Sequence, residues 1–140
     1  MRFLLLVCAC LCASCQLADP PEKVLKAFQD KYPNAEKIAW NIDRNARHEA
    51  DFTLDGTRFR ADFDADGNWV ETETSVKWDD LPDATKAAFK DEGKKKDIVE
   101  IELVVSHEKG RFYDIEYKTS GHKQDIMITP NGQVLGTDRH

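Results

Sequence analysis

The chain has 140 residues, of which 41% are hydrophobic and 33% are charged, and its formal net charge at pH 7 is −6. This length and composition are typical of a soluble globular protein with one domain or two small halves, and they imply no disorder. The acidic balance argues against nucleic-acid binding, because nucleic acids are bound through basic surfaces.

Residues 1–18 have the pattern of an export signal. Arg2 is followed by an apolar run, Phe3 to Leu11, that is too short to span a bilayer as a stable helix. The segment Cys12-Ala13-Ser14-Cys15 resembles a bacterial lipobox and predicts lipidation at Cys15, while ordinary cleavage after Ala18 is the alternative. We therefore expect an exported protein, in the periplasm or at the outer membrane, whose mature part contains no cysteine pair for a disulfide.

A predicted first unit, residues 19–77, opens with a helix. Asp19 is placed to cap the N-terminus of this helix, and Pro20 to occupy its first position. The helix is expected to end at Pro33. One face of it carries the apolar side chains Val24, Leu25, Phe28 and Tyr32.

Four predicted strands follow this helix, each indicated by alternation of apolar and polar residues. The helix should cover the sheet face that carries the apolar positions. These positions are Ile38, Trp40, Ile42, Ala50, Phe52, Leu54, Phe59, Ala61, Phe63 and Trp69. Their aromatic side chains are interpreted as core residues.

The last hairpin of this unit contains DFDADGNWVETE, which fits the EF-hand calcium-loop pattern. Flanking strands favour instead a type I turn with Gly67 in a bulge. In that register Glu71 and Glu73 should lie on the face opposite Asp62 and Asp64, which would divide the ligand set. We therefore predict a hairpin turn and no metal site, with calcium binding by Asp62, Asp64 and Asp66 as the alternative.

The second half of the chain, residues 78–140, repeats the first. LDGTRFRADFDADGNWV, residues 54–70, aligns without gaps on TSGHKQDIMITPNGQVL, residues 119–135. Asp80 should cap a second helix, which contributes Ala84, Ala88 and Phe89 to the core. The matching strand positions are Val99, Ile101, Leu103, Val105, Tyr113, Ile115, Tyr117, Ile126, Ile128 and Val134. The predicted fold class is α+β, with two tandem repeats that each pack one helix on a four-stranded antiparallel sheet.

The repeat layout, the phrase FDADGNWVETE and the closing TPNGQVLG resemble bacterial envelope proteins of the putative beta-lactamase-inhibitor-like, PepSY-like family. The resemblance covers residues 19–140. It implies a fold like that of the beta-lactamase inhibitory protein, which grips an enzyme with the open sheet face of two such units. It also implies a role in inhibiting or regulating peptidases. The chain departs from that inhibitor because no disulfide-forming cysteine follows the signal.

The predicted partner-binding site lies on the sheet face that the helices leave uncovered. In the second unit this face should carry Val104, Phe112, Met127 and Leu135 among charged residues. An exposed apolar patch with a charged rim is typical of protein-binding sites. The expected partner is an unidentified envelope protein, for instance a peptidase or another hydrolase. The alternatives are that the two units pack together or dimerise through this patch, or that one strand is out of register.

No catalytic residues and no cofactor are predicted. The histidines His48, His107, His122 and His140 are scattered, and the mature part has neither a cysteine nucleophile nor a serine in a nucleophile elbow. The expected function is a non-catalytic exported protein-binding module, such as an inhibitor or regulator of a peptidase or hydrolase. A calcium- or small-ligand-binding envelope module and a purely structural envelope lipoprotein are the alternatives.

Overall fold

The computed structural model of the chain describes residues 19–139. Cys15 and the predicted signal lie outside the described residues, as does His140. Two short 3-10 helices, Trp78–Asp80 and Lys95–Asp97, flank the second α-helix. The other elements are α1 (Glu22–Lys31), β1 (Glu36–Ile42), β2 (His48–Leu54), β3 (Thr57–Phe63), β4 (Trp69–Ser75), α2 (Asp83–Glu92), β5 (Ile98–Ser106), β6 (Gly110–Thr119), β7 (His122–Ile128) and β8 (Val134–Arg139).

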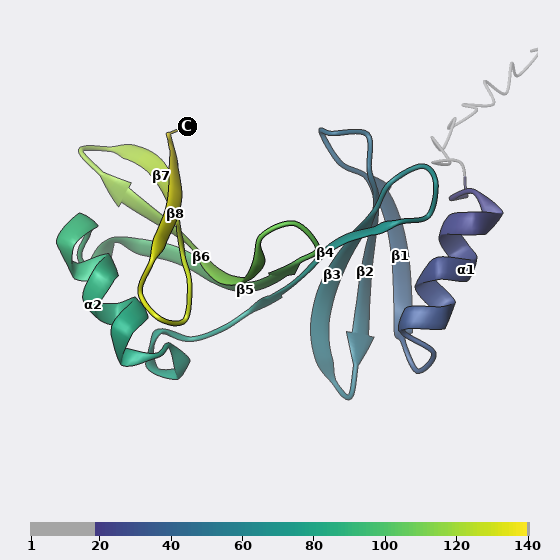
Figure 1. Cartoon of the computed structure of the whole chain (residues 1–140), viewed down its shortest axis with the longest axis horizontal. Coiled ribbons are helices and arrows are strands. Elements are labelled where there is room, and N and C mark those ends of the chain that lie inside the picture. Colours follow the sequence, from purple (N-terminus) through teal and green to yellow (C-terminus); the bar gives the residue numbers. More distant parts are fainter. Residues whose placement is uncertain (1–18, 140) are drawn as a thin grey trace, which may run out of the picture.

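The eight strands form one open antiparallel sheet in the order β1 to β8 (Figure 1). The prediction of two four-stranded sheets is therefore corrected to one sheet, because Glu71–Ser75 of β4 pairs with Glu102–Ser106 of β5. This pairing satisfies backbone groups that two separate sheets would leave at unpaired edges. The fold class is α+β, and the origin of the two halves as copies of one unit stays a prediction.

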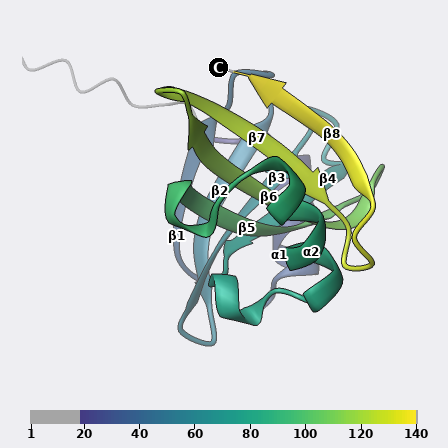
Figure 2. The same cartoon turned by 90° about the vertical axis from the view of Figure 1, so that its left-hand side faces the viewer.

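Both helices cover the same face of this sheet, α1 over the first half and α2 over the second (Figures 1 and 2). The core of the first half consists of Val24, Phe28, Ala50, Phe52, Ala61 and Phe63. The core of the second half consists of Leu81, Phe89, Ile101, Tyr113, Ile115, Tyr117, Ile126 and Ile128. Alternation in the sequence predicted most of these positions. In the described part of the chain, no helix is long and apolar enough to cross a membrane.

Both α-helices begin later than predicted. Pro21 and not Asp19 is the N-cap of α1, and Pro82 and not Asp80 is the N-cap of α2. The residue before a proline is disfavoured in the α-helical conformation, which explains why Pro20 and Leu81 lie outside the two α-helices. On the helices themselves, Leu25 is 39% exposed against expectation.

Some predicted core positions are exposed in the structure. Ile38 and Ile42 are 42% and 47% exposed, and both lie on β1, an edge strand with a register shift. Val99 is exposed at a second shift in β5, and Val134 is exposed at the start of the other edge strand, β8. An edge strand has a neighbour on one side only, which leaves part of its apolar surface in water.

Two hairpin turns contact the helix of their own half. Gly67 and Gly132 have φ angles of +85° and +86°, as expected for a glycine in a bulge. A Cβ atom at these positions would lie 2.8 Å from the carbonyl oxygen of Lys23 and 2.9 Å from that of Ala84. Each turn therefore needs glycine both for its backbone conformation and for its contact with a helix.

Candidate functional site

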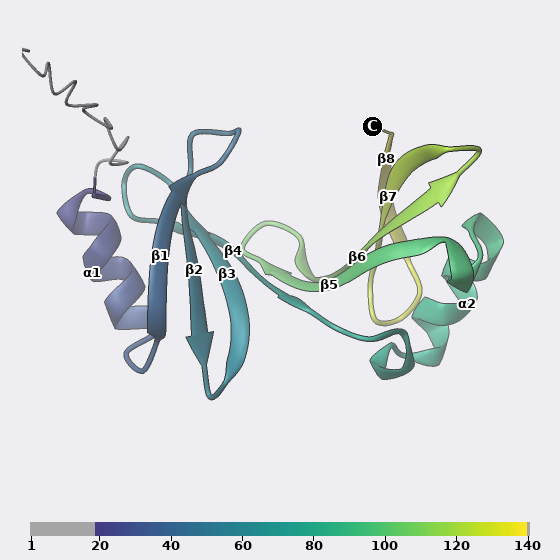
Figure 3. The ribbon, with the colours of Figure 1, turned by 180° about the vertical axis from the view of Figure 1, so that it is seen from behind.

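The sheet face opposite the helices lies on the inner side of the curve that the sheet makes, and neither α-helix covers it (Figures 1 and 3). We call this face of β2 to β8 the open face. Strand register places on it the side chains of Glu49, Asp51, Arg58, Arg60, Asp62, Glu71, Glu73, Ser75, Glu100, Glu102, Val104, Phe112, Asp114, Glu116, Lys123, Asp125 and Met127.

The apolar patch predicted on this face is not exposed at its centre. Val104 and Phe112 pair directly across β5 and β6, but they are only 2% and 3% exposed. Lys109 causes part of this burial, since its Nζ lies 5.8 Å from the centroid of the Phe112 ring and donates to Met127 Sδ at 3.6 Å. The expectation that Val104 and Phe112 are exposed is therefore wrong.

The two outer residues of the predicted patch differ in their placement. Met127 is half-buried and lies on the open face opposite Asp114. Leu135 is 37% exposed and falls in the register shift between Met127 and Ile128, so it has no partner in the ladder. The four residues thus do not form one exposed patch, and their part in binding stays a prediction.

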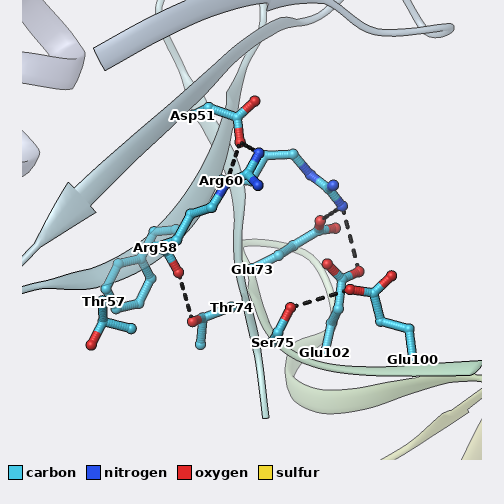
Figure 4. Close-up of a pocket in the computed structure, with 10 residues that line it drawn as sticks. Asp51, Thr57, Arg58, Arg60, Glu73, Thr74, Ser75, Glu100 and Glu102 are labelled. Atoms are coloured by element: carbon cyan, nitrogen blue, oxygen red, sulfur yellow. Dashed lines mark hydrogen bonds and ion pairs between the residues drawn. The ribbon is translucent and has the colours of Figure 1, made fainter. Parts of the chain in front are cut away.

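Arg60 links four strands of the open face. Its Nε lies 3.5 Å from Glu49 on β2. Its Nη2 donates to Glu73 on β4 and, at 3.4 Å, to Glu102 on β5 (Figure 4). Opposite charges therefore pair across these strands. Because Glu102 belongs to the second half, Arg60 also ties the two halves together.

A pocket of about 240 Å³ opens beside this arginine (Figure 4). On one side, Arg58 Nη2 donates to Asp51 Oδ1 at 2.7 Å. On the other side, Ser75 Oγ donates to Glu100 Oε1 at 3.2 Å. The pocket therefore spans the junction of the two halves and is lined mainly by charged groups that already have partners.

The predicted placement of Glu71 and Glu73, at the end of the calcium-loop pattern, is corrected by the structure. Phe63 pairs with Trp69 and Asp62 pairs with Glu71, so that Val70 is an extra residue between the two pairs. The extra residue shifts the alternation by one. Glu71 and Glu73 consequently lie on the same face as Asp62 and not on the opposite one.

The loop carboxylates nevertheless do not converge on one point. Asp64 accepts hydrogen bonds from the backbone N–H groups of Asp66 at 2.8 Å and Asn68 at 2.9 Å, which closes the turn. The side-chain amide of Asn68 also donates to Asp64 at 2.8 Å, and this bond, followed by the backbone hydrogen bonds, lowers the pKa of Asp64. Asp66 forms an ion pair with Lys23 on α1 at 2.5 Å. Over residues 19–139, no group of three His, Cys, Asp or Glu side chains is arranged to hold a metal ion.

Asp62 is the most buried charged residue of the open face, with 6% exposure. Its Oδ2 lies 4.0 Å from Arg47, and its Oδ1 has no hydrogen-bond partner among the described residues. Burial, together with the neighbouring carboxylates Glu49 and Glu71, raises the pKa of Asp62 to about 7. At neutral pH this group therefore carries a proton in a large fraction of molecules.

Asp114, in the second half, is also a partly buried carboxyl beside other carboxylates. Its Oδ1 is buried and also has no hydrogen-bond partner within the described chain. Burial raises the pKa of Asp114 to about 6, and Asp125 and Glu102 contribute in the same direction. The open face thus holds two carboxyl groups whose negative charge is poorly compensated within the protein.

Replacing Asp62 by asparagine should stabilise the protein at high pH. A carboxyl whose pKa is raised in the folded state stabilises it below the unfolded value, 3.8, and this contribution is lost as the pH rises to about 7. One pKa unit corresponds to about 1.4 kcal/mol, and the shift from 3.8 to about 7 exceeds one unit, so we expect D62N to gain at least about 1 kcal/mol at pH 8.

Urea unfolding at pH 4 and pH 8 measures this difference. At pH 4 the gain should nearly vanish, because Asp62 is then protonated in the folded state. The control is D91N, at an exposed position on α2. Equal effects of D62N at both pH values would contradict the prediction.

The histidines of residues 19–139 lie in three different parts of the fold. His48 lies in β2, His107 in the turn between β5 and β6, and His122 in β7. His48 and His122 each occupy the first position of a strand.

Sequence reasoning missed the roles of Arg60, Lys109 and Asp62. Arg60 and Asp62 lie on the uncovered face, but the bulge that brings Glu71 beside Asp62 has no clear sequence signal. Lys109 lies in a turn, and its contact with Phe112 depends on the turn's conformation.

The family model described as putative beta-lactamase-inhibitor-like, PepSY-like matches residues 46–136. The chain belongs to this family. No curated protein matches this PepSY-like chain.

Solved structures with the same fold come from Bacteroides species. A putative periplasmic protein from Bacteroides eggerthii is 28% identical, with a TM-score of 0.75 over 87% of this PepSY-like chain and 90% of that protein. A DUF2874 family protein from Bacteroides ovatus is 26% identical, with a TM-score of 0.74 over 87% and 89%. A BLIP-like protein from Bacteroides fragilis, 24% identical with a TM-score of 0.74 over 89% of both chains, shares the fold.

Proposed function

We propose that this chain is a non-catalytic exported protein-binding module that inhibits or regulates a peptidase or another hydrolase. The observation that carries the proposal is the open face, which both α-helices leave uncovered on the inner side of a curved sheet. An inward-curved face of this kind can receive a convex part of a partner. The inhibitor-like description of the family supports the choice of a hydrolase as that partner.

The open face is also held in a fixed arrangement before any partner binds. Arg60 orders Glu49, Glu73 and Glu102, while Lys109 orders Phe112 and Met127. Side chains that are already ordered lose little conformational entropy on association. The arrangement therefore favours a partner whose surface matches the ordered side chains.

The place of action proposed for the module is the cell envelope. The signal-like residues 1–18 and the lipobox-like Cys15 support export and a lipid anchor in the periplasm or at the outer membrane. The 28% identical structure is described as a putative periplasmic protein, which supports export as well. In this proposal, residues 19–77 and 78–140 arose by duplication of one helix-plus-four-strand unit.

A pull-down from the native cell envelope tests this function. The bait is the chain from Ala18 onward, which contains every residue of both described cores. In one variant, S75W places a bulky side chain at an exposed position of the open face. The matched control, A87W, adds the same side chain at an exposed position of α2.

We expect the original bait and A87W to retain one envelope protein and S75W to lose it. Mass spectrometry then identifies the captured protein, and its hydrolase activity is assayed with and without the purified chain. If all three baits retain the envelope protein, or if only A87W loses it, the binding site does not lie on the open face. A captured hydrolase whose activity does not change would overturn the inhibitory part of the proposal.

A further inference from the structure

The strand β1 lies at one edge of the sheet and keeps apolar side chains in contact with water (Figure 3). Ile38 and Ile42 are exposed, and between them Trp40 is half-buried against the ring of Phe28, with the ring centroids 5.2 Å apart. An exposed edge strand with apolar side chains is a ready template for pairing with a strand of another chain. The outer side of β1 is therefore a candidate site of association.

The backbone of β1 presents hydrogen-bonding groups on this outer side. At the turn between β1 and β2, the N–H group of Asp43 donates to the carbonyl oxygen of Arg47 at 3.0 Å. Along an antiparallel strand, alternate residues direct their N–H and C=O groups toward the same neighbour. Because Asp43 faces β2, Trp40 and Ile42 face the outer side, where no strand lies among residues 19–139. A strand added there can form hydrogen bonds with both residues.

The sequence of this edge is complementary to itself. Residues 36–44 read EKIAWNIDR. If two copies of this segment run antiparallel with Trp40 opposite Trp40, each residue faces its counterpart at the same distance on the other side of position 40. The pairs are then Glu36 with Arg44, Lys37 with Asp43, Ile38 with Ile42 and Ala39 with Asn41. Opposite charges and apolar pairs directly across neighbouring strands are stabilising, so a second copy of the chain matches this edge in charge and in polarity.

The other edge strand, β8, does not have this property. Its sequence VLGTDR, Val134–Arg139, places both charged residues at one end and the large apolar residues at the other. Antiparallel pairing of two β8 strands would set each charged residue opposite an apolar one. The complementarity thus selects β1 as the edge and a second copy as its occupant.

We propose that two copies of the chain form a dimer by antiparallel pairing of their β1 strands, with Trp40 of one copy opposite Trp40 of the other. The same surface of both copies forms the interface, as in most two-fold symmetric dimers. Residues directly opposite each other on paired strands point to the same face of the sheet. Both α1 helices therefore lie over one face of the joined sheet, and both open faces lie on the other.

This inference does not rest on the proposed function. Pairing uses the outer side of β1 and leaves the open face of β2 to β8 uncovered. A dimer holds two open faces side by side, which raises the avidity for a partner that offers two binding surfaces. A monomeric chain that still captures an envelope protein would contradict the inference alone, and a dimer that captures none would contradict the proposed function alone.

Sedimentation equilibrium of the chain from Ala18 onward tests the dimer through its charge pairs. In the proposed register, R44E sets a glutamate opposite Glu36 at both ends of the interface. The double variant E36R/R44E exchanges the two charges and restores pairs of opposite sign. The control K90E makes the same change in charge as R44E on α2, and all three substituted positions are exposed.

We expect the original chain and K90E to dimerise equally. R44E should weaken dimerisation about tenfold, since two attractive pairs become repulsive, and E36R/R44E should recover most of this loss. Circular dichroism should show that all variants keep the fold, because the substituted side chains are exposed.

Engineered cysteines test the register directly, since the chain from Ala18 onward contains no natural cysteine. Ala39 faces Asn41 of the other copy in a non-hydrogen-bonded pair, whose Cα atoms lie about 4.5 Å apart, within the range of a disulfide. On oxidation, a mixture of A39C and N41C chains should therefore give a disulfide-linked dimer. A39C alone should not, because the two copies of position 39 are too far apart.

Four outcomes would overturn the inference. The first is a monomer at every concentration, and the second is equal weakening by R44E and K90E, which would indicate a general effect of net charge. The third is crosslinking of A39C alone as efficiently as in the mixture, which would indicate a different register. The fourth is assembly beyond the dimer, which would indicate that β1 of one copy pairs with β8 of the next.

Discussion

Replacing Phe112 by aspartate is expected to unfold the protein. The Phe112 side chain is 3% exposed, pairs with buried Val104 and lies under Lys109. Loss of a buried phenylalanine costs about 3–5 kcal/mol, and a carboxylate placed in the same site adds the cost of burying a charge. The sum approaches the entire stability of a small domain, which is about 5–15 kcal/mol.

Urea unfolding followed by circular dichroism measures this effect. F112L serves as the control, since it keeps an apolar side chain and should remain folded with a loss of about 1–2 kcal/mol. A folded F112D with an unchanged urea midpoint would show that the side chain is exposed, as alternation in the sequence alone suggested. It would contradict the burial of Phe112 and Val104.

Replacing Arg60 by methionine should produce the second large loss of stability. The variant leaves Glu49, Glu73 and Glu102 without their shared cation, although their side chains are only 21%, 17% and 23% exposed. Breaking a fully buried ion pair costs about 3–5 kcal/mol. Because the Arg60 side chain is 38% exposed, we expect about 2 kcal/mol.

Arg58 provides the matched control for this prediction. It forms an ion pair with Asp51, but its side chain is 77% exposed, so R58M should lose much less stability than R60M. Urea midpoints at low salt compare the two variants. Equal losses would show that Arg60 does not link the strands in the way that its contacts indicate.

The same charges that make the open face a candidate binding surface also cost stability. Asp62 and Asp114 keep raised pKa values because they are buried beside other carboxylates. A protein selected for stability alone would have little reason to retain such groups, since stabilising substitutions are usually easy to find. Their presence on one face is therefore more readily explained by binding than by folding.

Much of the fold could be predicted from the sequence, because it follows from local patterns. Alternation in β2 and β3 placed Ala50, Phe52 and Phe63 in the core, where they are buried. The turn phrases around Gly67 and Gly132 predicted the hairpins and their left-handed glycines. These features depend on residues that are close in sequence, so periodicity and turn chemistry are sufficient to find them.

Features that depend on distant contacts could not be predicted. The pairing of β4 with β5 makes one sheet from two predicted ones, and it buries Val104 at the centre of that sheet. Val70 and Leu135 fall in register shifts that change which face the following residues occupy. Consequently the predicted exposure of the apolar patch was wrong at Val104 and Phe112, while the charged character of the surrounding face was correctly expected.

Site-specific photo-crosslinking in cells tests the central claim most directly. The photoreactive amino acid p-benzoylphenylalanine is incorporated at position 75 on the open face or, as the control, at position 87 on α2, both of which are exposed. The account predicts that position 75 crosslinks to one envelope protein and that position 87 does not. Crosslinks from position 87 alone, or none from either position under conditions where the chain is folded and exported, would contradict binding through the open face.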